Sequence, residues 1–143
     1  MSRGFAAVGL FNPKTPENFG ASLRAAFCYE AALIAYTGRR LGRSSLDTPK
    51  AYKSIPVLHV ENLQNAIPYD CVPVAVDLIE GATPLHKFYH PERAFYIFGP
   101  EDGTLGKQVT GFCKHTVYVP TRTCMNLAAT VNVVLYDRLA KAK

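Results

Sequence analysis

The stretch Val119-Pro120-Thr121-Arg122-Thr123-Cys124-Met125-Asn126-Leu127 runs directly into a helix-like segment, residues 128–136, near the C-terminus. A helix start leaves several backbone N–H groups without intrahelical partners, and these groups attract polar and anionic ligands. The stretch therefore predicts a polar loop at the mouth of a helix, where a ligand and a reacting group can lie together. Thr, Cys and Asn are also common as plain helix caps, so the loop alone does not identify a function.

Short apolar runs rich in β-branched and aromatic residues recur along the chain before this loop. We expect strands at residues 5–10, 33–36, 57–60, 72–78, 94–98 and 115–119, and helices at residues 18–29, 61–67, 107–112 and 126–143. Strands that alternate with helices indicate an α/β fold with a mostly parallel sheet flanked by helices. In such sheets, ligands bind beyond the carboxyl ends of the strands.

The composition is that of a globular protein, with 48% hydrophobic and 19% charged residues over 143 positions. A chain of this length buries roughly two-thirds of its unfolded surface. We therefore expect one domain over residues 1–143, with no disordered block.

Several classes of protein are disfavoured. The apolar run 5–11 is too short for a signal sequence or a membrane span, and no other segment approaches membrane length. The cysteines and histidines lack the spacing of a disulfide frame or a metal site, and no serine lies in a nucleophile elbow. The glycine spacing of a phosphate loop is absent as well. We expect a cytoplasmic protein with reduced thiols and no metal.

The net charge of +5 favours a polyanionic partner, and one segment concentrates the cations. Five basic residues fall within fifteen positions, interleaved with Gly, Ser and Pro, so they belong to a loop and not to one helix face. Such a loop can contact several phosphates of a nucleic acid, although it can equally be a solvated surface loop. The candidate phosphate-binding residues are Arg39, Arg40, Arg43, Lys50 and Lys53.

Two further stretches accompany the C-terminal loop. They are Thr15-Pro16-Glu17-Asn18-Phe19-Gly20-Ala21-Ser22-Leu23-Arg24-Ala25 and Phe95-Tyr96-Ile97-Phe98-Gly99-Pro100-Glu101-Asp102-Gly103-Thr104-Leu105. In this order the three stretches resemble the three motifs of the SpoU branch of the SPOUT methyltransferases, which methylate ribose 2′-hydroxyls of tRNA or rRNA. The resemblance spans nearly the whole chain.

The resemblance implies more than the sequence patterns predict. It implies a deep trefoil knot in the C-terminal third, S-adenosylmethionine as the cofactor in the knot loops, and a homodimer with active sites near the subunit interface. The run Met125-Asn126-Leu127, together with the lack of an appended RNA-binding domain, looks most like the minimal tRNA wobble-position enzymes. We therefore expect tRNA as the substrate ahead of rRNA.

Arg24 matches the family arginine that is most closely tied to activation of the 2′-hydroxyl. A guanidinium is a poor general base because its pKa exceeds about 12, so an electrostatic role toward phosphate or alkoxide is expected. The alternative is an ordinary helix arginine that pairs with Glu17 or Glu30. With Arg24, the candidate catalytic residues implied by the resemblance are Asn18, Glu101 and Asn126.

Asn126 begins the last helix, where it can bind the ribose, hold Arg24, or act only as a helix cap. Backbone groups of the strand-end loops are expected to bind the cofactor at the positions that match the family. These positions are Leu78, Gly99, Val119 and Cys124.

Three features depart from the family pattern. Cys124 stands where most members have serine and forms weaker hydrogen bonds. Gly103 comes one position early, with Thr104 where glycine is usual, and the loop 119–124 is short. These departures keep two rivals open: a catalytically silent RNA-binding relative, and a methyltransferase with an altered substrate such as rRNA. An unrelated nucleotide-binding α/β protein is disfavoured by the ordered occurrence of all three motifs.

Overall fold

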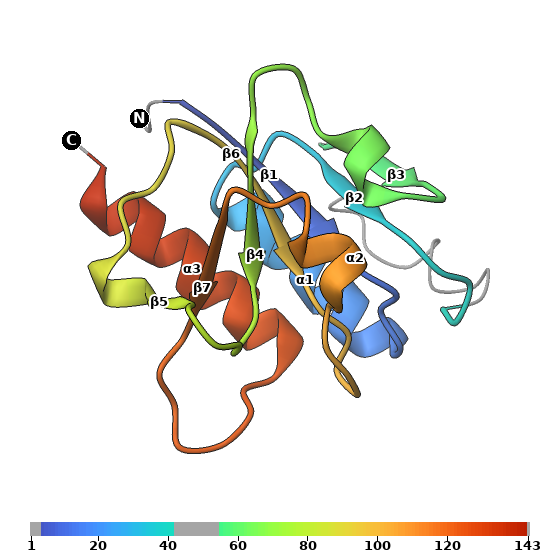
Figure 1. Ribbon diagram of the computed structural model, residues 1–143. Helices are drawn as coiled ribbons and strands as arrows, with labels where there is room; N and C mark the ends of the chain where they lie inside the picture. Colours follow the sequence, from blue (N-terminus) through green and yellow to red (C-terminus); the bar gives the residue numbers. More distant parts are fainter. Residues whose placement is uncertain (1–3, 42–54, 143) are drawn as a thin grey trace.

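The computed structural model describes residues 4–41 and 55–142 (Figure 1). The strands are β1 (Phe5–Leu10), β2 (Ile34–Tyr36), β3 (Val57–His59), β4 (Val72–Val76), β5 (Thr83–Pro84), β6 (Arg93–Phe98) and β7 (His115–Tyr118). The helices are α1 (Pro16–Cys28), α2 (Lys107–Thr110) and α3 (Leu127–Lys141), with 3₁₀ turns η3 (Leu63–Ala66) and η4 (Leu85–Lys87).

The described strands form one sheet in the order β3-β2-β1-β6-β4-β7-β5, and every pair in it is parallel. The long strands β1 and β6 lie side by side in the middle, with Phe5 opposite Arg93 and Leu10 opposite Phe98. Their nearly continuous apolar sequence is typical of parallel strands that are covered on both faces. The predicted α/β fold with a mostly parallel sheet is confirmed, while the trefoil knot stays a prediction.

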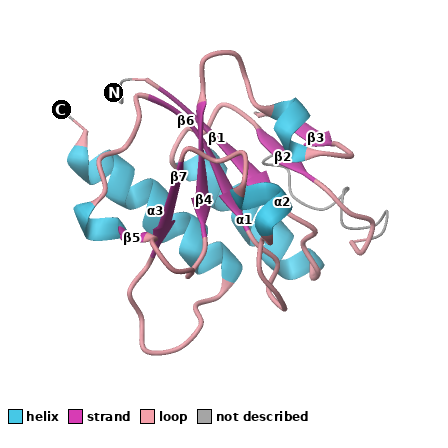
Figure 2. Cartoon of the chain, in the orientation of Figure 1, coloured by secondary structure: helices cyan, strands magenta, loops and turns pink. Residues whose placement is uncertain are grey.

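Two apolar layers cover the sheet, whose strands lie between the helices (Figure 2). On one face, α1 and α3 pack with Phe19, Leu23 and Val131 against alternate strand residues such as Tyr96. On the other face, η3 and α2 pack against Phe95 and its neighbours. The alternation follows from the two-residue period of a strand, which sends successive side chains to opposite faces.

The helix boundaries differ from the prediction where local caps decide them. The first helix begins at Pro16 and not at Asn18, because the Thr15 side chain accepts a hydrogen bond from Asn18 N and proline suits the first turn. The predicted helix 61–67 is only the 3₁₀ turn η3, which ends at Ala66; the next residue, Ile67, has an extended backbone and precedes Pro68. A residue that precedes proline is driven out of the helical region, so this turn cannot continue.

The structure also shortens one predicted strand and adds an element. The strand expected at 72–78 ends at Val76. The short strand β5 and the turn η4 were not predicted, since two or three residues carry no measurable periodicity. Within the described residues, none of the helices has the length and apolar character that crossing a membrane requires.

Candidate active site

The three motif stretches meet at the carboxyl edge of the sheet, where the loops after β1, β6 and β7 lie. A chain of side-chain hydrogen bonds joins them. Asn126 Nδ2 donates to Asn18 Oδ1 at 2.6 Å, and Asn18 Nδ2 donates to Glu101 Oε2 at 3.2 Å. One residue from each motif therefore belongs to a single network.

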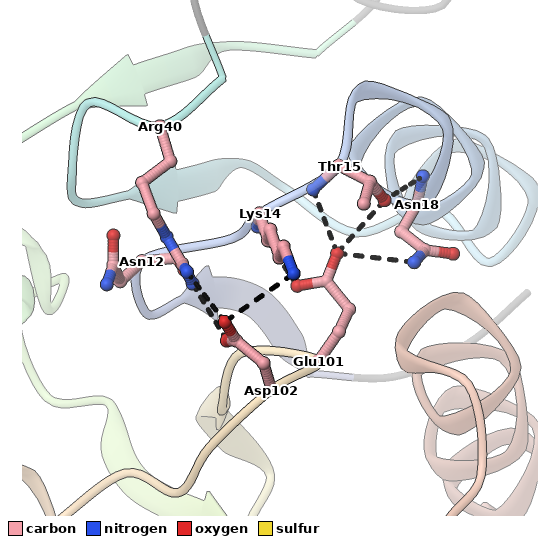
Figure 3. Close-up of polar contacts among 7 residues, drawn as sticks. All are labelled: Asn12, Lys14, Thr15, Asn18, Arg40, Glu101 and Asp102. Atoms are coloured by element: carbon pink, nitrogen blue, oxygen red, sulfur yellow. Dashed lines mark hydrogen bonds and ion pairs between the residues drawn. The ribbon is translucent and has the colours of Figure 1, made fainter.

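Glu101 is the acceptor at the end of this network. Its Oε1 accepts from Lys14 N at 3.0 Å, and its Oε2 accepts from the backbone N and the hydroxyl of Thr15, each at 3.1 Å (Figure 3). Burial raises the pKa of Glu101, but hydrogen bonds from its own backbone, Lys14, Thr15 and Asn18 outweigh burial and lower it below 4.5. Glu101 is therefore an ionised acceptor that fastens the start of α1 to the loop after β6.

Asn126 caps the last helix, as expected, and also makes a contact that was not predicted. Its Oδ1 accepts from Ala129 N at 3.2 Å, which caps α3, while its Nδ2 donates to Asn18. The expected contact with Arg24 is replaced by this contact with Asn18. Because the carboxylate of Glu101 only accepts, it orients the amide of Asn18, and Asn18 in turn orients the amide of Asn126.

A cavity of about 800 Å³ opens beside this network, between the loops after β4, β6 and β7. Its wall contains all four residues predicted to bind the cofactor, Leu78, Gly99, Val119 and Cys124, together with Glu101. Leu78 is 75% exposed, so it forms part of the open rim. The volume lies in the range of pockets that hold small ligands and cofactors, about 300–1,000 Å³.

Arg24 lies apart from the hydrogen-bonded network. It is exposed on α1, and its guanidinium forms no hydrogen bond or ion pair with any described residue. The alternative pairing with Glu17 or Glu30 is therefore not present. It is six residues after Asn18, about 240° further around the helix, so the two side chains leave α1 in different directions. Within the part of the chain that the structure describes, Arg24 therefore presents an unpaired cation to the solvent.

The two described cations of the basic segment have different surroundings. Arg39 is 83% exposed and approaches Glu61 at 3.5 Å through a single nitrogen. Arg40 donates to both carboxylate oxygens of Asp102, at 2.9 and 3.1 Å, and to Asn12 O at 2.6 Å. The other three predicted RNA-binding residues, Arg43, Lys50 and Lys53, lie outside the described residues.

Sequence reasoning missed three residues that build the site. Thr15 and Lys14 hold Glu101, and Asp77 Oδ2 accepts from Leu105 N at 3.2 Å while it lines the cavity. A threonine followed by proline is a recognisable helix start and could have identified Thr15. No local pattern identifies Asp77 or Lys14, since their partners are distant in sequence.

A second cavity, of about 670 Å³, lies against the last turns of α3 and contains none of the predicted site residues. The described residues contain no group of three or more His, Cys, Asp or Glu side chains that could hold a metal ion. All four cysteines are free of disulfides.

Comparisons with solved structures agree with this architecture. SpoU methyltransferase AviRb from Streptomyces viridochromogenes, solved with AdoMet, matches 99% of this chain and 59% of its own, with a TM-score of 0.83 and 20% identity. An AdoMet-bound rRNA methyltransferase from Sinorhizobium meliloti matches 96% of this chain and 57% of its own, at 0.83 and 19%. The chain thus spans about three-fifths of the length of these relatives.

A structure concerned with the 2-OH methylation of C/U34 on tRNA matches 99% of this chain and 92% of its own, with a TM-score of 0.76 and 21% identity. None of the curated proteins compared with this chain matches it. At these identities the structural matches support the fold, and the predicted S-adenosylmethionine cofactor agrees with the two relatives solved with AdoMet.

The family comparison covers the same three stretches. A model of the SpoU rRNA Methylase family matches residues 6–136, which contain the whole hydrogen-bonded network and the cavity beside it. The chain therefore belongs to the SpoU family of RNA methylases.

Proposed function

We propose that this chain transfers a methyl group from S-adenosylmethionine to a ribose 2′-hydroxyl of RNA. The observation that carries the proposal is the network Asn126–Asn18–Glu101, which joins all three motifs beside a cavity of cofactor size. Membership of the SpoU family and the two AdoMet-bound relatives support the same reaction.

The cavity suits an adenosine cofactor. Its wall is made mainly of loop residues 98–103 and 118–125, which bring backbone groups close to a bound ligand. The carboxylate of Glu101 in that wall already accepts hydrogen bonds from four donors of the protein. Its role is therefore to shape the cavity, while backbone groups of the loops recognise the ligand. The residues present therefore fit the cofactor.

When bound, S-adenosylmethionine would supply a methyl group on a positively charged sulfur; transfer of this group to the 2′-oxygen would leave a thioether and release the hydroxyl proton to solvent. Arg24 is our candidate for stabilising the developing alkoxide and binding the adjacent phosphate, because its guanidinium is exposed and has no partner among the described residues. Asn18, Glu101 and Asn126 would act by keeping the loops in place.

We infer tRNA as the substrate ahead of rRNA. The relative concerned with tRNA C/U34 is matched over 92% of its chain, whereas the two relatives with AdoMet are matched over about three-fifths. The basic segment that begins at Arg39 would bind RNA phosphates. We further propose that the protein acts as a homodimer in the cytoplasm.

Transfer of labelled methyl groups from S-adenosylmethionine to bulk tRNA and, separately, to rRNA tests the proposal. Nucleoside analysis of the labelled RNA should show a 2′-O-methylated nucleoside, and Arg24→Ala serves as the matched negative control. A label found on a base would contradict the proposed target.

A silent RNA-binding relative is the second candidate, and one observation favours it. Cys124 lines the cavity with a thiol where most relatives have a serine hydroxyl, so a cofactor hydrogen bond is weakened at that position. Binding of S-adenosylmethionine without any transfer to tRNA or rRNA would establish this alternative.

A further inference from the structure

Asp102 follows Glu101 in the loop after β6 and makes a different set of contacts. Arg40 Nη1 lies 2.9 Å from Asp102 Oδ2, Arg40 Nη2 lies 3.1 Å from Oδ1, and Lys14 Nζ lies 3.9 Å from Oδ2 (Figure 3). The carboxylate therefore meets a two-pronged guanidinium and a second cation. This paired geometry is the strongest that an arginine and a carboxylate can form.

Arg40 is held on its own side by a well-defined turn. Gly38 has a φ of +87°, and a side chain there would collide with Asn12. Thr37 is buried, its N donates to Leu10 O at 3.1 Å, and its Oγ1 accepts from Asn12 N at 3.0 Å. The guanidinium thus projects from a backbone that leaves it little freedom.

The contacts of Arg40 tie three neighbouring strand-end loops together. Arg40 follows β2, Asn12 follows β1, and Asp102 follows β6, and these three strands are adjacent in the sheet. Hydrogen bonds from Arg40 lower the pKa of Asp102, so the pair stays ionised at neutral pH. The nearby Arg39–Glu61 pair differs, because it uses one nitrogen at 3.5 Å and both side chains are more than four-fifths exposed.

The loop held by Asp102 is also a wall of the cavity. Gly99, Pro100, Glu101 and Gly103 all line it, and Gly103 N closes a turn onto Pro100 O at 3.4 Å. Within this turn Glu101 is fastened toward α1 and Asp102 toward Arg40. The carboxylates hold the turn from two directions.

We propose that Asp102 and Arg40 are positioning residues, which hold residues 99–103 against the loops after β1 and β2 and so keep the cavity in its cofactor-binding shape. This inference rests on the proposed function. It also gives Arg40, whose guanidinium donates at the surface to Asp102 and to Asn12 O, a positioning role in place of the predicted role as an RNA phosphate ligand.

The test compares Asp102→Asn, Arg40→Lys, the double variant, and the control Glu61→Gln, which removes the other ion pair of the same segment. S-adenosylmethionine affinity is measured by calorimetry, and bulk tRNA affinity at two salt concentrations. Each single variant should weaken S-adenosylmethionine binding on the order of fivefold, because Asp102→Asn removes the ion pair and Arg40→Lys removes its two-pronged geometry. The double variant should be no weaker than either single. Glu61→Gln should bind like the wild type.

The RNA measurement separates positioning from phosphate binding. With a positioning role, Asp102→Asn leaves tRNA affinity and its salt dependence unchanged. A variant that binds S-adenosylmethionine normally but binds tRNA more tightly would overturn the inference, because the freed Arg40 would then be a phosphate ligand. Additive losses in the double variant would overturn it as well.

Hydrogen exchange of the free chain makes the inference testable without cofactor or RNA. Amides of residues 99–105 should exchange faster in Asp102→Asn and Arg40→Lys than in the wild type or Glu61→Gln. Unchanged exchange would contradict the positioning role even if methyl transfer occurs. If the wild-type chain transfers no methyl group, the proposed function is refuted. Faster exchange in the two variants would then still support the anchoring of the loop by Asp102 and Arg40.

Discussion

Asn18 illustrates how single amides organise this site. Its Oδ1 accepts from Asn126 and its Nδ2 donates to Glu101, so both ends of the side chain are used between partners from two other motifs. An aspartate of the same size would lose the donor and bring a second negative charge toward Glu101. An asparagine fits this position because it offers both the acceptor that Asn126 needs and the donor that Glu101 needs.

Arg24→Ala should abolish methyl transfer and leave S-adenosylmethionine affinity nearly unchanged. Arg24 is exposed and does not line the cavity, so its removal takes away a charge for RNA and for the alkoxide but no cofactor contact. Single-turnover transfer and calorimetry measure the two effects. Unchanged turnover would remove Arg24 from the mechanism.

Glu101→Gln should destabilise the fold by about 1 kcal/mol, since an amide replaces a carboxylate that accepts from charge-neutral donors near the surface. Folding lowers the pKa of Glu101, so its contribution is complete above the ordinary value of 4.5 and is lost as the pH falls through the lowered pKa. The free energy of unfolding, measured in urea at several pH values, should fall less steeply below pH 4.5 in Glu101→Gln than in the wild type. Glu80→Gln, at an exposed position outside the network, is the control.

At the scale of elements, a partly buried polar cluster at the end remote from the cavity joins α3 to β6 and to the loop that precedes β6. His90 Nε2 and Nδ1 lie 2.7 Å from Asp137 and Tyr96 OH, and Arg138 donates to Tyr96 OH at 3.0 Å. A neutral His90 with its proton on Nε2 satisfies all three contacts, with Tyr96 donating to Nδ1. Burial also raises the pKa of Tyr96 to about 12, so its hydroxyl remains a donor.

The stability of this connection should fall on acidification. Burial lowers the pKa of His90 below 6.5 in the folded chain, against the opposing effect of Asp137 and with smaller contributions from Lys141 and Arg138. The unfolded chain therefore takes up the proton first, and stability is lost as the pH falls below 6.5 toward the lowered pKa, by at most about 1.4 kcal/mol per pH unit. Denaturant unfolding between pH 7.5 and 5 measures this slope.

His90→Gln should flatten that slope while lowering stability at neutral pH. His86→Gln, at an exposed position in η4, provides a control for a histidine outside the cluster. An equal slope in His90→Gln and the wild type would show that His90 is not the group responsible.

At the scale of the whole molecule, α1 and α3 cover one sheet face and expose apolar side chains on their outer side. Val133, Tyr136 and Leu139 of α3 are 37%, 57% and 48% exposed, and Phe27 of α1 is 46% exposed. By contrast, Leu127, Val131, Val134 and Leu135 of α3 are buried against the sheet. An exposed apolar surface on packed helices is typical of an interface.

Tyr136→Asp should convert the proposed homodimer into a monomer, because a charge placed in an apolar interface loses its hydration without a partner. Sedimentation equilibrium at micromolar concentration measures the mass of the wild type and of the variant in solution. Gln108→Asp, an exposed change on α2, is the control. A wild-type chain that sediments as a monomer would refute the homodimer.

The sequence by itself determined the approximate positions of the longer strands and helices, the α/β class and the three motif stretches, because apolar periodicity and turn residues act within about ten positions of one another. The tertiary structure alone decided which side chains meet. Because α3 packs beside α1, Asn126 reaches Asn18 across 108 positions, and because β2, β1 and β6 are neighbours, Arg40 reaches Asp102 across 62. Strand order is set by packing of the whole core, and no local pattern encodes it. The predicted basic segment contains Arg40, and its contact with Asp102 is not encoded in the segment because the two residues are 62 positions apart.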